Sequence, residues 1–303
     1  SRPGTTYSLN AVGTSPGWYT DNTYKNVTKV VFDASFSAAY PKSTFSWFAR
    51  MTNLTSITGL SNLSTFYTQD MSYMFYGCTG LTSLDLTGFQ TPNLKNMEYM
   101  FFNCSNLTRV DLSSFNTAGV TNMNYLFRGC SRLATIYAGS GWTIPAVTAG
   151  NFMFSGCTNL VGGRGTTYDA SHVDKTYAHI DGGSSNPGYL TAVDYGLSVG
   201  GVAVTYKNAS NITGPGIVSG TASYNPSTRT LTLNNVNITL NTAAGISVNG
   251  TFDGDVCYIN LVGDNHLDVT NYYSLFVEKA TTITGNGTLD MGSGSIKVSL
   301  SAP

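Results

Sequence analysis

The feature that most constrains this chain is a motif that returns at a fixed spacing. Its anchor is a cysteine, and the spacings are 26, 26 and 27 residues, between Cys78, Cys104, Cys130 and Cys157. Each cysteine has Met or Leu four residues before it, Phe three before it, and Leu three after it. A repeat of this kind buries its apolar side chains only by stacking copies, and about three copies are needed for stability. A degenerate copy around Met51 brings the number here to about five, and Val27–Asp33 is expected to be an opening strand and cap.

Two apolar periodicities occur within each copy. Helical spacing relates Leu94, Met97, Met100 and Phe101, and a second set consists of Val120, Met123, Leu126 and Phe127. A short amphipathic helix is therefore predicted just before each cysteine. The segment Leu84–Leu86 alternates apolar and polar residues, which predicts a short strand with one buried face. Strand plus helix at this period is typical of leucine-rich repeats, so residues 1–190 are predicted to form an α/β leucine-rich-repeat solenoid with an N-terminal cap and a closing loop.

The sequence changes character after the turn-rich stretch Asp181–Gly188. Short runs then alternate Thr or Asn with Val, Ile or Leu, which is typical of strands with one buried face. Two sets of residues align at coil-like spacing: Ile246, Leu275 and Ile296, and Val248, Val277 and Val298. Residues 191–303 are therefore predicted to form a small all-β domain, a short parallel β-helix of about three rungs, with a β-sandwich as the alternative.

The stretch NMEYMFFNCSNLTRVDLSSFNT (residues 96–117) resembles the repeat of BspA-like leucine-rich-repeat surface proteins of bacteria. The resemblance covers about residues 45–190, and FSGCTNLVGGRGTTYD (154–169) is similar to the way such arrays end. It implies a non-enzymatic extracellular or cell-surface protein that adheres to host proteins or other cells. The departures are Met51 in place of Cys, and Gly141 where earlier copies have Phe. The stretch LTLNNVNITLNTAAGISVNG (residues 231–250) is similar to carbohydrate-binding β-helix modules of bacterial surface proteins, a looser resemblance that covers about residues 225–303.

Charge and hydropathy exclude two classes of partner. The chain has 15 basic and 16 acidic residues, a net charge of −1, so it lacks the electrostatic character that binds nucleic acid or an anionic membrane. Apolar runs are too short for a membrane span, and membrane insertion is not expected.

Cysteines, histidines and acids are expected to be structural. Four of the five cysteines occupy one position of the repeat, so free buried thiols are favoured over disulfides or a metal site. The histidines His172, His179 and His266 show no ligand spacing. An acidic group could hold Ca²⁺, although its residues more simply mark turns: Asp253, Asp255, Asp264 and Asp268. No metal and no cofactor is expected.

Three classes of function compete. The favoured one is binding of a host extracellular-matrix or cell-surface protein by residues that alternate with buried ones along the strands: Ser83, Asp85, Thr87, Arg109, Asp111, Ser113, Thr135 and Tyr137. The alternative is polysaccharide binding by the C-terminal domain, with candidate stacking residues Tyr258, Tyr272 and Tyr273. The last two are adjacent and would point to opposite faces of a strand. A polysaccharide-cleaving enzyme is disfavoured because no acid pair recurs from rung to rung.

Overall fold

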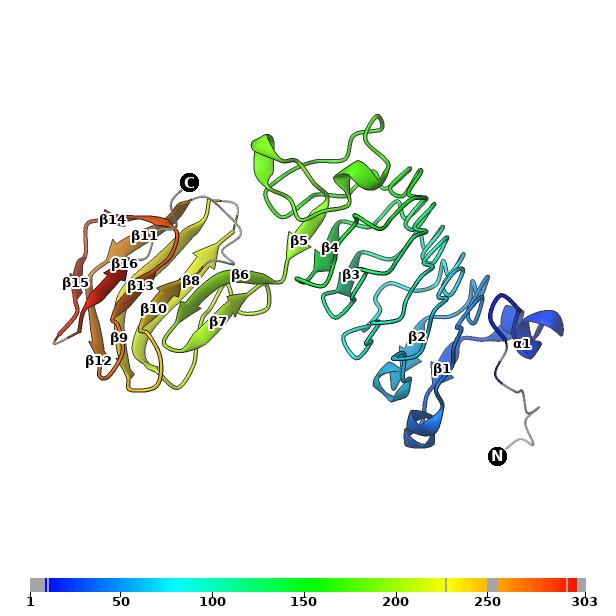
Figure 1. Ribbon diagram of the computed structural model, residues 1–303, viewed down its shortest axis with the longest axis horizontal. Coiled ribbons are helices and arrows are strands. Elements are labelled where there is room, and N and C mark those ends of the chain that lie inside the picture. The colour runs from blue at the N-terminus through cyan, green and yellow to red at the C-terminus, as the bar shows by residue number, and fades with distance from the viewer. Residues whose placement is uncertain (1–8, 10, 227, 250–255, 293, 299–303) are drawn as a thin grey trace. The chain divides into compact units, whose positions relative to one another are not determined.

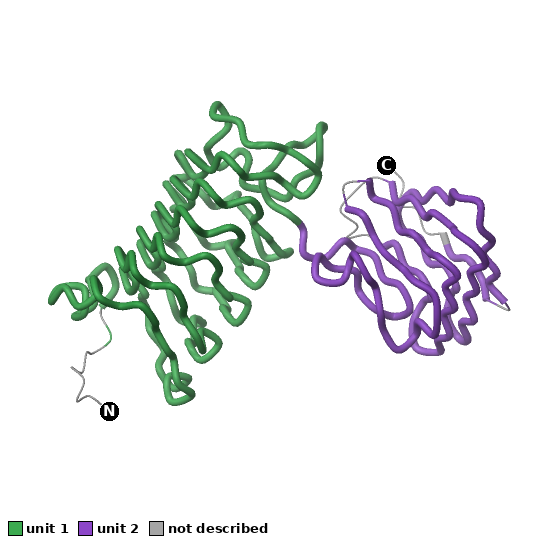
Figure 2. The backbone as a smooth tube through the Cα atoms, turned by 180° about the vertical axis from the view of Figure 1, so that it is seen from behind, with its two compact units in different colours: residues 1–191 green, residues 192–303 purple. Residues whose placement is uncertain are grey.

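A computed structural model describes residues 9, 11–226, 228–249, 256–292 and 294–298. The chain forms two compact units, residues 1–191 and 192–303 (Figure 2). Within the described residues these are β-solenoids with about nine turns in total and little helix. Across the same residues, every helix falls short of the length and apolar character needed to span a bilayer.

The first unit is a stack of coils with short strands on one face (Figure 1). Its strands are β1 Lys29–Val31, β2 Ser56–Thr58, β3 Arg109–Leu112, β4 Thr135–Ala138 and β5 Leu190–Ala192. Its helical turns are α1 Gly17–Thr20, η1 Thr23–Asn26, η2 Ala34–Ala38, η3 Leu60–Asn62, η4 Lys175–Tyr177 and η5 Gly183–Ser185. Parallel pairing joins β1 to β2, and a second sheet has the order β3-β4-β5. The predicted opening strand is confirmed as β1, whereas the segment predicted as a strand at 84–86 belongs to no strand.

The helices predicted before the cysteines, at 94–101 and 120–127, are wrong, because these segments are turns. In the copy before Cys78, alternate N–H groups donate to carbonyls of the next coil at 2.7–2.9 Å: Tyr73 to Glu98, Phe75 to Met100 and Gly77 to Phe102. The N–H groups between them donate three residues back: Met74 to Met71, Tyr76 to Tyr73 and Cys78 to Phe75. In an α-helix each N–H donates to the carbonyl four residues earlier. Here alternate N–H groups donate to the next coil instead, so an α-helix cannot form.

This turn requires residues with positive φ, which helices lack. One such position lies directly before the cysteine and holds Gly77, Asn103, Gly129 and Gly156. The other lies five residues before the cysteine and holds aromatic residues with φ of 54–59°: Tyr73, Tyr99, Tyr125 and Phe152. A left-handed conformation costs a non-glycine residue about 1–2 kcal/mol. The stacked neighbours of these aromatic residues must therefore offset that cost.

Inside the stack, equivalent side chains form continuous columns. Rings of Phe48, Phe75, Phe101, Phe127 and Phe154 follow one another with centroids 5.3–5.9 Å apart. The predicted cysteine column is confirmed, with all four thiols free and buried. Each Sγ donates to a phenylalanine carbonyl of the preceding coil at 3.0–3.1 Å: Cys78 to Phe48, Cys104 to Phe75, Cys130 to Phe101 and Cys157 to Phe127. Burial raises the pKa of Cys157 to about 12, so the thiol stays neutral.

A threonine at the end of a copy joins adjacent coils in the middle of the stack. The buried Thr117 hydroxyl donates to the Thr143 carbonyl and accepts from its N–H, both at 2.7 Å. Thr91 makes the same pair of bonds with Asn116, at 3.1 and 2.8 Å. One side chain thus satisfies both backbone groups of a residue in the next coil.

The glycine that departs from the repeat has a local cause. A Cβ at Gly141 would lie 2.7 Å from the Phe115 carbonyl oxygen, so the backbone of this coil passes too close for a side chain. The adjacent Trp142 is buried instead, and its Nε1 donates to the Ala178 carbonyl at 2.9 Å.

The second unit is a short parallel β-helix (Figure 1) rather than a β-sandwich. Its strands are β6 Asp194–Val199, β7 Val202–Thr205, β8 Ile217–Asn225, β9 Thr230–Leu240, β10 Ile246–Val248, β11 Val256–Val262, β12 Asp264–Val269, β13 Leu275–Val277, β14 Ala280–Gly285, β15 Thr288–Asp290 and β16 Ile296–Val298. One sheet has the order β16-β13-β10-β6-β7, and the other β14-β11-β9-β12-β15 with β8 paired to β9. Strands β6, β7 and β8 pair antiparallel at the first rung.

The alignment predicted from the sequence is confirmed residue by residue in this sheet. Parallel pairing matches Ile246 with Leu275 with Ile296, and Val248 with Val277 with Val298. The buried Asn265 fixes a corner between rungs, because its Oδ1 accepts from Val236 N at 2.9 Å and its Nδ2 donates to the Thr288 carbonyl at 3.1 Å.

Candidate interaction surfaces

Strands β3 and β4 present half of the predicted strand-face residues in register. Arg109 pairs with Thr135 and Asp111 pairs with Tyr137. These four side chains are exposed or half-buried, while the residues that alternate with them are fully buried: Val110, Leu112, Ile136 and Ala138. We call Arg109, Asp111, Thr135 and Tyr137 the strand-face cluster. Its members also interact electrostatically, since burial and the Asp111 charge raise the pKa of Tyr137 and the Arg109 charge opposes them.

The other predicted residues of this face have local roles. Ser83, Asp85 and Thr87 are exposed but lie outside any strand. Asp85 Oδ1 accepts from both the N–H and the hydroxyl of Thr87, at 3.1 and 2.6 Å. Likewise Asp111 Oδ1 accepts from Ser113 N at 2.9 Å. Such bonds form Asx turns, so these carboxylates shape their own loops in addition to facing solvent.

A second surface is formed by the turns that precede the cysteines, and we call it the turn face. It could not be recognised from the sequence alone. Four aromatic rings stack from coil to coil, with centroids 4.7, 4.6 and 5.5 Å apart and interplanar angles of 12–23°: Tyr73, Tyr99, Tyr125 and Phe152. We call them the aromatic ladder. Tyr99 and Tyr125 each stack against a ring on both sides, whereas Phe152, at the end of the ladder, is 49% exposed. Burial, followed by the Glu98 charge, raises the pKa of Tyr73 to about 12, which keeps its hydroxyl protonated.

Arginines lie over this ladder and over a second stacked pair of rings, Tyr76 and Phe102. The Arg128 guanidinium is 5.5–6.0 Å from the ring centroids of Phe102, Tyr125 and Phe152. Arg50 lies 5.8 Å from the Tyr76 ring, which stacks on Phe102 at 4.9 Å. Tyrosine and arginine are enriched in the energetically important parts of protein interfaces, so the turn face is a second candidate surface.

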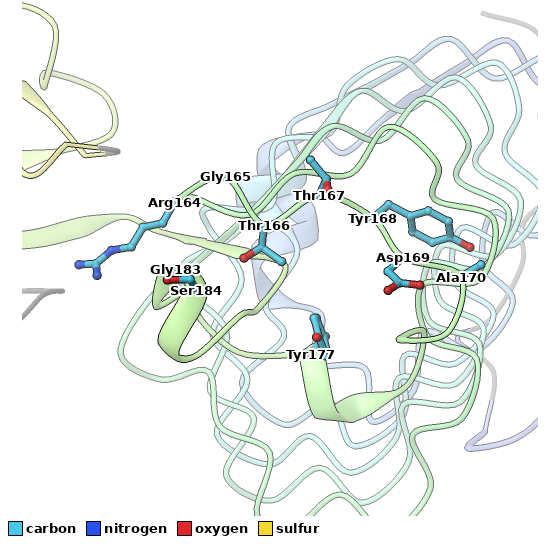
Figure 3. A pocket seen from close by; sticks show the side chains of 10 residues that line it. All are labelled: Arg164, Gly165, Thr166, Thr167, Tyr168, Asp169, Ala170, Tyr177, Gly183 and Ser184. Carbon is cyan, nitrogen blue, oxygen red and sulfur yellow. The ribbon is translucent and has the colours of Figure 1, made fainter.

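The closing loop of the first unit is organised by one buried carboxylate. Asp181, only 1% exposed, accepts hydrogen bonds from Arg164 N, Thr166 N, Thr166 Oγ1, Gly183 N and Gly188 N at 2.7–3.4 Å. Burial opposes its ionisation, but the hydrogen bonds prevail and lower the pKa of Asp181. Beside it lies an open pocket of about 790 Å³ (Figure 3).

The C-terminal tyrosines lie differently from the prediction. Tyr272 and Tyr273, 49% and 37% exposed, are not in a strand, and both line an open pocket of about 610 Å³ with Thr270, Asn271 and Ser295. The expectation that they point to opposite faces of a strand is therefore wrong. Tyr258 lies apart from this pocket, on β11.

The remaining candidates are tied to nearby residues. His172 and His266 contact carboxylates, Asp169 at 3.1 Å and Asp290 at 2.9 Å, and His179 Nδ1 lies 2.9 Å from the Ile180 carbonyl. The proposed Ca²⁺ ligands Asp253 and Asp255 lie outside the described residues. Where side chains are described, His, Cys, Asp and Glu form no group of three suited to a metal ion.

Comparison with known proteins gives one result. Residues 43–186 match the family described as "Mycoplasma protein of unknown function, DUF285". A search of curated proteins and a search of solved structures each found no match. The matched stretch includes the stacked coils and most of the closing loop, which is compatible with a repeat surface protein.

Proposed function

We propose that this chain is a non-enzymatic interaction protein of the BspA-like repeat type, secreted or displayed on a bacterial surface, that binds a host or cell-surface protein through the strand face. The observation that carries the proposal is the strand-face cluster, which places an arginine, a tyrosine, a carboxylate and a hydroxyl on two adjacent parallel strands. Solenoids commonly bind partners along such strand surfaces. The DUF285 match and the sequence resemblance support a surface protein.

The test compares binding of the full chain with that of three variants. The first carries Arg109→Glu with Tyr137→Ala, and the charge-matched control carries Arg132→Glu, an exposed residue outside the strands. Asp85 and Asp111 are left unchanged because their carboxylates hold turns. Binding is measured by biolayer interferometry on purified fibronectin, laminin, collagen and fibrinogen, with circular dichroism as the folding check.

We expect at least one matrix protein to bind, and the double variant to lose about tenfold or more in affinity while the control changes little. Equal affinities for the double variant and the wild-type chain would remove the strand face as the site. A third variant, Tyr99→Gly, perturbs the aromatic ladder; loss of binding there alone would move the site to the turn face.

A second candidate function is polysaccharide binding by the β-helix unit, favoured by the pocket that contains both Tyr272 and Tyr273. Lys297 lies 5.5 Å from the Tyr273 ring and Phe276 stacks on it at 6.1 Å, so Tyr272 is the freer ring for a sugar. A glycan array probed with the full chain and with Tyr272→Ala tests this role. Polysaccharide binding at this pocket requires that the full chain bind at least one glycan on the array and that Tyr272→Ala abolish this binding.

A further inference from the structure

We infer that the closing-loop pocket of the first unit is a binding site for a neutral sugar ring. The pocket lies within residues 164–184 and is distinct from the strand face and from the Tyr272 pocket. Its volume, about 790 Å³, falls in the range of small-molecule sites. Side chains that line it include Thr166, Asp169, Tyr177 and Ser184, and Figure 3 shows them around one opening.

The pocket is preformed, because two buried groups tie its walls together. The Asp181 carboxylate holds Arg164 and Thr166 on one side and Gly183 on the other. The hydroxyl of the buried Tyr189 accepts from Asp169 N at 3.0 Å. A site held in this way loses little conformational freedom when a ligand binds.

The lining favours a ligand rich in hydroxyl donors. Thr166 Oγ1 donates its proton to Asp181, so it offers a lone pair to a ligand. Hydrogen bonds from the N–H and hydroxyl of Ser171, together with His172, lower the pKa of Asp169 to about 2, so its carboxylate is charged at neutral pH. Each carboxylate oxygen can accept more than one hydrogen bond, which leaves acceptor capacity for sugar hydroxyls.

Aromatic surface and charge narrow the ligand class further. The half-buried Tyr177 packs against His172 and Tyr189, with ring centroids 4.5 and 4.9 Å away. The parts of Tyr177 and of the half-buried Tyr168 that line the pocket provide apolar surface against which the C–H groups of a sugar can pack. The Arg164 side chain extends away from the opening (Figure 3), and its Nη1 lies 3.5 Å from the Gly182 carbonyl. Arg164 is among the residues that line the pocket, but so is Asp169, and the charged Asp169 carboxylate disfavours anionic ligands such as phosphates.

The chain offers a matched pair of variants. Asp169 and Asp174 both form Asx turns, with Oδ1 accepting from the N–H and hydroxyl of Ser171 and of Thr176 respectively. Asp169 lines the pocket, whereas Asp174 is not among the lining residues. Asp169→Asn and Asp174→Asn therefore make the same change in charge and keep the same turn acceptor, but only one alters the pocket.

The experiment is ligand-observed NMR on the full chain with glucose, galactose, mannose, N-acetylglucosamine and the anionic N-acetylneuraminic acid. We expect at least one neutral sugar to bind at about millimolar Kd, a loss of about tenfold in Asp169→Asn, and no change in Asp174→Asn. No neutral sugar binding, equal effects of the two substitutions, or preference for the anionic sugar would overturn the inference. Binding that is lost in Tyr272→Ala and kept in Asp169→Asn would also overturn it, because the sugar would then belong to the second unit.

Discussion

Tyr99 allows a test of the turn geometry. The informative quantity is the sign of the stability difference between the Tyr99→Gly and Tyr99→Ala variants. The residue has φ of 55° and stacks on Tyr73 and Tyr125 at 4.7 and 4.6 Å. Replacing it by Ala removes both stacked contacts, each worth about 0.5–1.5 kcal/mol, and keeps the left-handed backbone. Replacing it by Gly removes the same contacts but also releases about 1–2 kcal/mol of backbone strain.

Tyr99→Gly should therefore be more stable than Tyr99→Ala by about 1 kcal/mol, after allowing for the greater flexibility of unfolded glycine. At an ordinary strand position the order is reversed, and Ala is favoured over Gly by about 0.5–1 kcal/mol. The control is the same pair of substitutions at Val31, a 63% exposed residue of β1.

The assay is urea unfolding followed by far-ultraviolet circular dichroism and by tryptophan fluorescence, with coincident transitions as the check on two-state behaviour. If Tyr99→Ala proved as stable as Tyr99→Gly, the left-handed conformation at this position would be refuted, and with it the turn that replaces the predicted helix.

Three further predictions concern stability of the first unit. Leu107→Ala, in the core, should cost about 2–5 kcal/mol in urea unfolding, and the exposed Thr108→Ala within about 0.5 kcal/mol; equal costs would contradict the assigned burial. Thr117→Val should cost about 1–3 kcal/mol because the two Thr143 backbone groups lose their partner, whereas Thr117→Ser should retain most of the stability. Asp181→Asn should lower stability at pH 7 by on the order of 2 kcal/mol. Because the folded pKa of Asp181 is lowered, its contribution is present above the unfolded pKa of about 3.9 and is lost as pH falls through the folded value, so urea midpoints of the two proteins should converge at low pH.

Burial in the repeats could be predicted from the sequence, but the backbone conformation could not. The apolar residues at 94–101 are spaced about three apart. Both a helix and a series of turns place residues at this spacing on one side of the chain, so the spacing alone does not distinguish the two. Distinguishing them requires knowing that alternate N–H groups find partners in the next coil, which no single copy contains. A local signal existed in Gly77, Gly129 and Gly156, one residue before each cysteine, since glycine is favoured where φ is positive.

The candidate surfaces were predictable to different degrees. Alternation along β3 and β4 predicts which face Arg109 and Tyr137 occupy, because the side-chain period of a strand is two. Tyr73, Tyr99 and Tyr125 each lie five residues before a cysteine. The predicted helices gave no reason for these three rings to stack on one another, so the aromatic ladder was not expected. Asp181 falls in a stretch that looks like a linker, and its donors between residues 164 and 188 converge only after the loop has closed.

The stacking of near-identical coils can be tested most directly with selenomethionine and anomalous X-ray diffraction. Met71, Met97 and Met123 are fully buried and occupy equivalent places in three consecutive coils, whose backbones are hydrogen-bonded at these residues. Their selenium atoms should form a row with neighbours about 5 Å apart, the spacing of adjacent strands. Selenium sites out of line, or separated by more than about 10 Å between consecutive coils, would contradict the stacked solenoid.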